Sequence, residues 1–398
     1  MKTILIKRYY QLLYLVLLGI LTLGQLQRWQ LTPNIAMYVH DLIITLWLLS
    51  SFATHWPAWM GLLSVVKSWL YQQKILLLLL SWSLLGLIIN TTLTGEMTAW
   101  LYLARATAYV SFSLSLKFIT PFNFNQMKWS WIGVGMIFLV GGLLQYFYLP
   151  DTRFLYELGW DDHFYRLIGT MLDPGFSGII FVMTLIMLYS IKSLPNKLLI
   201  ALSLPLTLGI ALTYSRATYL ALVVGSLVLI GQQWLWKQRR DWLLVLCSGL
   251  LVCSLPFLPN PGGEGVDLSR TSSIVARQTS TQKMITNLKP YQLIIGRGLL
   301  NPASTTITND IPDTAHFPDN LLVFIFISTG MIGLGLFLVG LVKVGRNFFN
   351  NQPYLLSLSL AVFIHSQFNH TLFQPMVMII FSSWLVLELA NSSSKVEK

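Results

Sequence analysis

The chain has 398 residues, of which 55% are hydrophobic and only 10% are charged. Soluble domains carry about 25% charged residues, so this composition excludes an ordinary globular protein and indicates a polytopic membrane protein. The formal net charge of +11 is no sign of nucleic-acid binding, because basic residues of a membrane protein first reflect its orientation in the bilayer. We therefore expect an all-α protein that resides in a lipid bilayer and binds no nucleic acid.

Apolar stretches recur along the whole chain. A helix needs about 20 apolar residues to cross the hydrocarbon core, and by this criterion we expect about 12 transmembrane helices in a single transmembrane domain, residues 1–398. The run 56–70 is too short and contains Lys67, so it is expected to lie at the membrane surface. The expected spans are 10–26, 36–54, 75–93, 97–119, 129–149, 175–192, 197–213, 217–234, 242–258, 319–343, 354–371 and 374–390.

Basic residues predict the orientation of these spans. The first apolar stretch follows Lys2, Lys7 and Arg8 and lacks a small-residue cleavage pattern after it, so we expect an uncleaved anchor. Cytoplasmic loops of membrane proteins are enriched in Lys and Arg. With the N-terminus inside, such residues occur in every cytoplasmic connection and near both ends of the chain. We therefore expect both termini in the cytoplasm.

Three polar interruptions then fall on the same outer face: the segment 150–174, the break at Ser215-Arg216 and the large extracytoplasmic loop 259–318. A polar interval as long as the last is uncommon in a compact protein and is usually functional or disordered. Within it, residues 268–288 can form a short helix. Arg270 and Arg277 would then lie two turns apart on nearly one face, ready to share an anionic ligand.

Arginine side chains at this outer face are candidate anion ligands. Arg216 follows an apolar run with no real loop, so it is expected at or just inside the membrane boundary. It could simply extend to lipid headgroups, or it could clamp an anion, because a guanidinium makes bidentate contacts with phosphate. Arg166 precedes a helix start that suits anions, and Arg297 lies in a tight Gly-Arg-Gly turn.

Acid–base candidates also have structural explanations. Asp173 precedes Pro174 at the start of an apolar run, where it is expected to cap the helix. His316 could act as a general base near neutral pH, and Asp319 could do the same or orient an attacking hydroxyl. Asp319 and Asn320 would equally well cap the helix that follows. No group of ligands has the spacing of a metal site, and no nucleotide loop is present, so we expect no metal or other cofactor.

Taken together in their order and spacing, these residues resemble the bacterial O-antigen ligase/polymerase family, membrane glycosyltransferases that use polyprenyl-diphosphate-linked glycans. Ligases of this family typically have histidine where this chain has Asp319, and the family usually has asparagine where it has Gly175. The Asp form is more like polymerases and less-characterised relatives than like lipid A-core ligases. The likeness covers residues 160–385 and rests on Arg166…Gly169…Asp173-Pro174-Gly175, Thr213-Tyr-Ser-Arg216-Ala, Arg277 ahead of Gly296-Arg297-Gly298, and Asp319-Asn320 ahead of Gly330-Met-Ile-Gly333.

The resemblance implies transfer or polymerisation of a glycan from a polyprenyl-diphosphate donor onto a hydroxyl of a glycan or glycolipid acceptor, with a polymerase favoured over a ligase. It implies a multi-pass protein of the inner (cytoplasmic) membrane with an extracytoplasmic active face, acting in cell-surface polysaccharide assembly. His316 or Asp319 would receive or orient the acceptor hydroxyl, and fixed cations would stabilise the departing diphosphate without a metal. The expected diphosphate ligands are Arg216 and Arg277, assisted by Arg166 or Arg297.

Two other functions fit the composition. A polytopic transporter of polysaccharide or other solutes would tend to show repeat symmetry and broken helices near the bilayer midplane, whereas polarity here gathers at one face. A non-catalytic partner in envelope assembly is the other alternative.

Overall fold

The computed structural model describes residues 2–32, 35–95, 97–236, 242–259, 261–263, 265–301 and 317–396, and this part of the chain is mostly helical. The α-helices are α1 (Lys2–Leu21), α2 (Val39–Gln72), α3 (Lys74–Thr94), α4 (Thr98–Ser115), α5 (Phe124–Tyr148), α6 (Pro174–Ser190), α7 (Asn196–Leu212), α8 (Arg216–Trp236), α9 (Trp242–Ser254), α10 (Ser272–Thr286), α11 (Gln292–Ile295), α12 (Leu321–Asn351), α13 (Pro353–His365) and α14 (Pro375–Val396). Short 3-10 helices are η1 (Gly24–Gln27), η2 (Arg153–Leu158), η3 (Gly169–Met171), η5 (Leu255–Phe257) and η6 (Thr371–Phe373). One antiparallel hairpin joins β1 (Arg28–Thr32) and β2 (Ile35–Tyr38).

The helices have the length and apolarity of a polytopic membrane protein. Among the described residues, α1, α3, α5 and α12 contain segments long and apolar enough to cross a bilayer, and several shorter helices are also apolar. Each of the predicted apolar ranges coincides with one of the helices α1–α9 and α12–α14. The helical, membrane-embedded class is thus supported, while the number of helices that cross the bilayer stays a prediction.

Helix α2 contains the run 56–70 that was predicted to lie at the membrane surface. The helix kinks at His55, whose φ of −127° and ψ of 30° are not helical, two residues before Pro57. Proline removes a helical hydrogen bond and clashes with the preceding turn, which explains the kink. Beyond it, Trp56, Met60 and Leu63 are exposed. These apolar side chains would suit lipid, and their depth in a bilayer stays a prediction.

The centre of the bundle is α6. All of its residues except Phe176 and Ser190 are buried, and it packs against α5, α7, α8 and α13. A helix that is apolar on every side is stable only when other helices surround it. The N-terminus of α6 points toward the end of the bundle that carries the polar connections. This buried helix therefore holds its first residues in place at that end.

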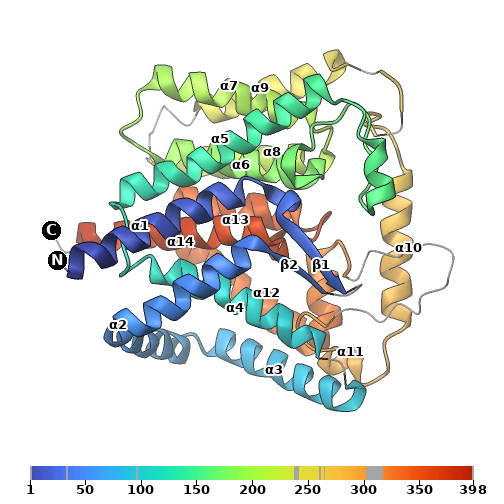
Figure 1. Cartoon of the computed structure of the whole chain (residues 1–398). Coiled ribbons are helices and arrows are strands. Elements are labelled where there is room, and N and C mark those ends of the chain that lie inside the picture. Colours follow the sequence, from blue (N-terminus) through green and yellow to red (C-terminus); the bar gives the residue numbers. More distant parts are fainter. Residues whose placement is uncertain are drawn as a thin grey trace.

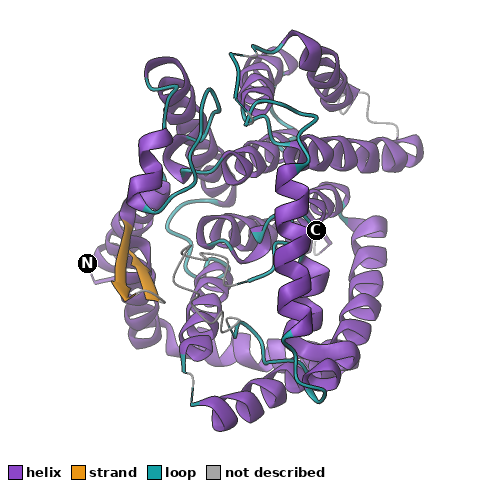
Figure 2. Cartoon of the chain, turned by 90° about the vertical axis from the view of Figure 1, so that its right-hand side faces the viewer, coloured by secondary structure: helices purple, strands orange, loops and turns teal. Residues whose placement is uncertain are grey.

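The long polar connections gather at one end of the bundle, opposite the two termini (Figure 1). The α5–α6, α7–α8 and α9–α12 connections meet there with the β-hairpin, as expected for the three polar interruptions. Seen toward this end, α10 lies across the ends of the other helices (Figure 2).

Gly330 and the turn 296–298 form a close contact, here called the glycine joint, which fixes the C-terminal part of the α9–α12 connection. Gly330 interrupts α12 with a φ of 67°, and a Cβ there would lie 2.1 Å from the carbonyl oxygen of Ile294. The N–H groups of Arg297 and Gly298 donate to the carbonyls of Ile327 (2.8 Å) and Ser328 (2.9 Å), just before this break. The Gly-Arg-Gly turn and the glycine that begins the Gly-Met-Ile-Gly motif therefore pack against each other, and only glycine allows the close approach.

Candidate active site

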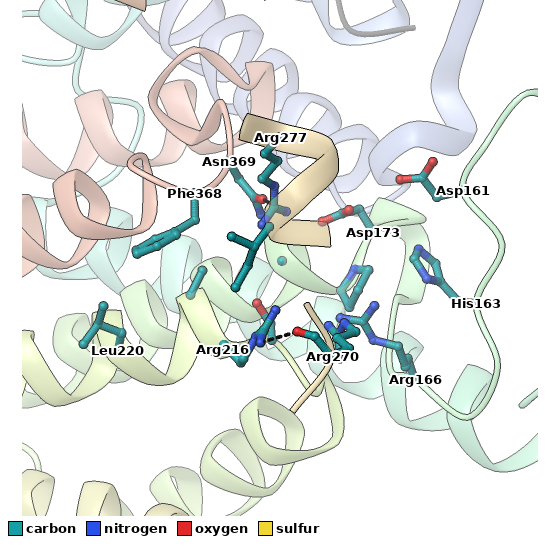
Figure 3. A pocket seen from close by; sticks show the side chains of 15 residues that line it. Asp161, His163, Arg166, Asp173, Arg216, Leu220, Arg270, Arg277, Phe368 and Asn369 are labelled. Carbon is teal, nitrogen blue, oxygen red and sulfur yellow. Dashed lines mark hydrogen bonds between the residues drawn. The ribbon is translucent and has the colours of Figure 1, made fainter. Parts of the chain in front are cut away.

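A cavity of about 410 Å³ lies at this polar end (Figure 3). The segments that form it come from the α5–α6, α7–α8, α9–α12 and α13–α14 connections and from the first turns of α6, α8 and α10. The convergence of connections that are distant in sequence makes this cavity the candidate site. Its lining residues are Asp161, His163, Arg166, Asp173, Pro174, Gly175, Ser215, Arg216, Ala217, Leu220, Arg270, Ile274, Arg277, Phe368 and Asn369.

Arg216 is the first residue of α8 and ties that helix to the segment before α10. Its Nη1 donates to the carbonyl oxygens of Leu268 (3.2 Å) and Arg270 (2.8 Å). The guanidinium therefore lines a cavity within the protein, which differs from an arginine that only extends to lipid headgroups. Held by two carbonyls, it keeps its position before any ligand arrives.

Arg166 and Arg270 converge on the turn between α7 and α8. Arg166 donates from Nε to the carbonyl of Thr213 (3.0 Å) and from Nη2 to that of Tyr214 (3.4 Å). Arg270 donates from Nη1 to the carbonyls of Gly265 and Asp267, both at 2.7 Å, and from Nη2 to that of Tyr214 at 3.5 Å. Burial, with the nearby Arg270, lowers the pKa of Arg166 to about 10, so it still carries its charge at neutral pH.

Backbone strain accompanies these arginines. Tyr165, Leu172 and Tyr214 have φ values of 50°, 54° and 50°, in the left-handed region that non-glycine residues rarely adopt. Each lies within two residues of a charged lining residue, namely Arg166, Asp173 and Arg216. Strain of this kind costs about 1–3 kcal/mol per residue and concentrates at functional sites.

Arg277 projects from α10 and is held by two side chains. Its Nε donates to Oδ2 of Asp319 at 3.1 Å, and its Nη2 donates to Oδ1 of Asn369 at 3.0 Å. Asn320 caps α12, because its Oδ1 accepts from the N–H of Val323 at 3.0 Å. Of the two residues predicted as caps, Asn320 thus fills the role and Asp319 is left to pair with the cation. Burial raises the pKa of Asp319, and the charge of Arg277 offsets this in part.

The first residues of α6 line the cavity. Asp173 caps this helix, as predicted, by accepting from the N–H of Phe176 at 2.7 Å. Burial raises the pKa of the Asp173 carboxyl. Two residues after Asp173, a Cβ on Gly175 would lie 2.2 Å from Nδ2 of Asn369. Glycine at position 175 is therefore what allows the Asn369 amide to reach Arg277.

His163 also lines the cavity, and its ring points inward from the α5–α6 connection (Figure 3). The residue is 8% exposed, and its Nε2 is buried without a hydrogen-bond partner among the described residues. Burial, followed by the charges of Arg166 and Arg270, lowers the pKa of His163 to about 3, so the ring is neutral at physiological pH.

Sequence reasoning did not identify His163, Asp161 or Asn369 as site residues. His163 follows two aspartates in a polar loop and belongs to no motif, and its closeness to Arg166 in the chain was the only available signal. Asn369 belongs to none of the motifs that the sequence analysis singled out.

The predicted site residues divide into three groups. Arg166, Arg216 and Arg277 line the cavity, with Asp319 attached to Arg277. Arg297 is not among the lining residues, because its turn packs on α12 and its Nη2 donates to the carbonyl of Asn287 at 3.0 Å. His316 lies outside the described residues.

The predicted helix 268–288 was too long. Helix α10 begins at Ser272, so Arg270 precedes it and shares no helical face with Arg277. Residues 265–270 instead form turns that wrap around the arginine side chain through the carbonyls of Gly265 and Asp267. Both arginines nevertheless reach the cavity.

Comparison with protein families gives a match over part of the chain that forms the cavity. The family model described as O-antigen ligase matches residues 198–338, a range that includes Arg216, Arg270, Arg277 and Asp319. The 150–174 segment, with His163 and Arg166, lies before the matched range. Searches of curated proteins and of solved structures returned no match. The chain thus carries a domain of the O-antigen ligase family.

Proposed function

We propose that the protein is a membrane glycosyltransferase that moves a glycan from a polyprenyl-diphosphate donor onto an acceptor hydroxyl. Membership in the O-antigen ligase family supports lipid-linked glycans as the substrate class. The observation that carries the proposal is the convergence of Arg166, Arg216, Arg270 and Arg277 on one cavity. Two lining carboxylates, Asp161 and Asp173, leave this set with an excess of positive charge.

The apolar, cationic and polar parts of the cavity follow one another in the order of the chemical groups of such a donor. Leu220 and Phe368 lie on one side of it, Asp161 and His163 lie on the other, and Arg216 and Arg277 lie between them (Figure 3). A donor likewise consists of an apolar prenyl chain, a diphosphate and a sugar. We place the prenyl chain beside α8, the diphosphate on the arginines and the sugar at the polar side.

Catalysis in this arrangement rests on stabilising the leaving group. The departing diphosphate gathers negative charge, and donors that are fixed in advance stabilise such charge most effectively. Arg216 is fixed by two carbonyls, and Arg277 is fixed by Asp319 and Asn369. We propose that these two cations bind the diphosphate, assisted by Arg166, and that the reaction proceeds without a metal or a covalent intermediate.

The acceptor hydroxyl would approach from the side of Asp319. In this proposal Asp319 holds Arg277 and orients the hydroxyl, and the role of His316 stays a prediction. Asp319 also favours a polymerase over a ligase, because the related ligases have histidine at this position.

The proposed membrane arrangement is one domain, residues 1–398, in the inner membrane, with about 12 spans of bilayer length and both termini in the cytoplasm. The 259–318 loop and the cavity would then face the extracytoplasmic side. The position of the cavity at the end of the bundle opposite the termini supports this orientation.

Purified protein in lipid nanodiscs, given a polyprenyl-diphosphate glycan and an acceptor glycan, tests the proposal. A new glycosidic linkage, detected by mass spectrometry, is the expected product, and its loss in Arg216→Ala and Arg277→Ala would locate the site. In proteoliposomes, uptake of glycan without a new linkage would identify a transporter instead. Absence of both would leave a non-catalytic envelope partner and overturn the proposal.

A further inference from the structure

The polar side of the cavity contains a buried imidazole that has no role in the contacts described above. The four lining arginines donate to carbonyls or to Asp319 and Asn369, and Asp173 caps α6. By contrast, Nε2 of His163 is buried without a partner in the described part of the chain. Buried polar atoms of this kind usually have a partner, so the imidazole in the wall of this cavity is available to a group that enters it.

The chain around His163 is held firmly. Both the N–H and the Oγ1 of Thr152 donate to the carbonyl of His163 at 2.9 Å, and an antiparallel bridge pairs the neighbouring Phe164 with Asp151. On the other side, the N–H of Tyr165 donates to the carbonyl of Pro150 at 2.8 Å. The imidazole is therefore presented to the cavity from a fixed backbone, as a catalytic group must be.

The position of His163 matches the position of the reacting bond. It lies beyond Arg216 and Arg277 from the apolar side, next to Arg166 and Asp161 (Figure 3). If the arginines hold the diphosphate, the sugar and the incoming acceptor must occupy this polar side. We propose that His163 is the catalytic residue that takes the proton of the acceptor hydroxyl.

The step conserves atoms and charge. The acceptor oxygen forms a bond to the anomeric carbon of the donor while its proton passes to the imidazole of His163. The bond between that carbon and the diphosphate oxygen breaks, and the electron pair leaves with the polyprenyl diphosphate, which the arginines stabilise. The imidazolium then releases its proton to water.

Donor binding would prepare His163 for this role. In the empty site, burial and the charges of Arg166 and Arg270 lower its pKa. A diphosphate bound to these arginines adds negative charge and raises the pKa of the imidazole toward the neutral range, where a general base is most effective. The histidine would thus become a base only when there is a donor to consume.

The inference rests on the proposed function, and its test separates the two. Wild type and His163→Gln are compared in nanodiscs for formation of the glycosidic linkage and for binding of a polyprenyl-diphosphate glycan. We expect the variant to lose about a hundredfold or more in turnover while its affinity for the donor changes less than about threefold, because the arginines remain. Failure of the wild type to form the linkage would refute the proposed function itself.

Chemical rescue distinguishes a proton acceptor from a structural residue. His163→Ala leaves space for a free imidazole, which should restore part of the turnover in proportion to its concentration. The control His55→Gln, at the α2 kink away from the cavity, should leave turnover unchanged.

An active wild type with a fully active His163→Gln would overturn the assignment. So would a loss explained entirely by weaker donor binding, or the lack of rescue by imidazole in a folded His163→Ala. If the Gln variant does not fold, the Ala variant and its rescue decide the question.

Discussion

Nε of Arg277 lies 3.1 Å from Oδ2 of Asp319, and this contact joins α10 to the residue before the N-cap of α12. The two side chains are 40% and 44% exposed, so their Coulomb attraction alone stabilises little. The contact instead fixes the orientation of Arg277, because the same guanidinium also donates to Asn369. Arg277 is thereby aimed by two acceptors at once.

Substitution of Arg277 should therefore act on catalysis. We expect Arg277→Ala to lower glycosyl transfer about a hundred- to a thousandfold, the usual effect of removing one preorganised donor. Arg277→Lys should also be impaired, because an ammonium group cannot reproduce the directed guanidinium fork. Turnover of the purified variants gives the measurement.

The partner residue supplies the test of coupling. Asp319→Asn should reduce turnover less than Arg277→Ala does, and the double variant should lose less than the product of the two single losses. A matched control is Arg346→Ala, which removes an exposed arginine near the other end of α12, outside the cavity, and should have no effect. Simple additivity of the two losses would contradict a shared role.

The contact between Gly175 and Asn369 predicts a compensating pair. A side chain at position 175 would collide with the Asn369 amide, so Gly175→Asn should displace it and impair glycosyl transfer. Asn369→Gly should also be impaired, because Arg277 loses one acceptor.

The double substitution removes the collision between positions 175 and 369. It also supplies an amide beside Arg277 again, now from α6. We expect Gly175→Asn with Asn369→Gly to recover part of the turnover that each single variant loses. A double variant less active than both single variants would show that the two positions do not exchange their amide.

The glycine joint should matter for stability. Gly330 combines a φ of 67° with a Cβ position 2.1 Å from the carbonyl of Ile294. We expect Gly330→Ala to destabilise the fold by about 1–3 kcal/mol from backbone strain, with the collision adding to this. A lower thermal unfolding midpoint in detergent would confirm it. Gly249→Ala is the control, because Gly249 lies within α9 with open space around its Cβ position, and alanine favours a helix.

The apolar side of the cavity predicts which anions compete with the donor. Inorganic pyrophosphate can use only the arginines, whereas a short prenyl diphosphate also covers Leu220 and Phe368. Each buried methylene contributes about 0.8 kcal/mol, so a prenyl diphosphate should bind at least about tenfold more tightly. Competition against a labelled donor measures both affinities. Equal affinities would place the tail elsewhere, and Leu220→Gln should reduce the difference.

The helices could be predicted from sequence because apolar length alone determines them. The ends of α10 could not, because this helix is polar and largely exposed, and its N-cap residue Thr271 makes no side-chain hydrogen bond to it. Its start follows the turns that residues 265–270 form around the Arg270 side chain, which also donates to the distant carbonyl of Tyr214. Such contacts leave no periodic pattern in the sequence.

The charged residues of the candidate site could be predicted from the sequence, whereas the contacts they make could not. Arg216 was identified because an arginine beside an apolar run demands an explanation. Arg277 was identified because a helix over 268–288 would place it two turns from Arg270. Asp319 and Asn320 were indistinguishable as caps until the structure paired one of them with Arg277. His163 became a candidate only through burial and the absence of a described partner, and neither property can be read from neighbouring residues.

The carbonyl of Tyr214 accepts from both Arg166 and Arg270, so cations crowd the site before anything binds. Charge alone therefore cannot separate a glycan carrier from the phospholipid headgroups that surround the protein. In the proposed function, selection would come from shape: a single slender tail on one side of the cavity, and hydroxyl groups within reach of Asp161 on the other. The two sides of the cavity would thus select the substrate, and the arginines between them would bind it.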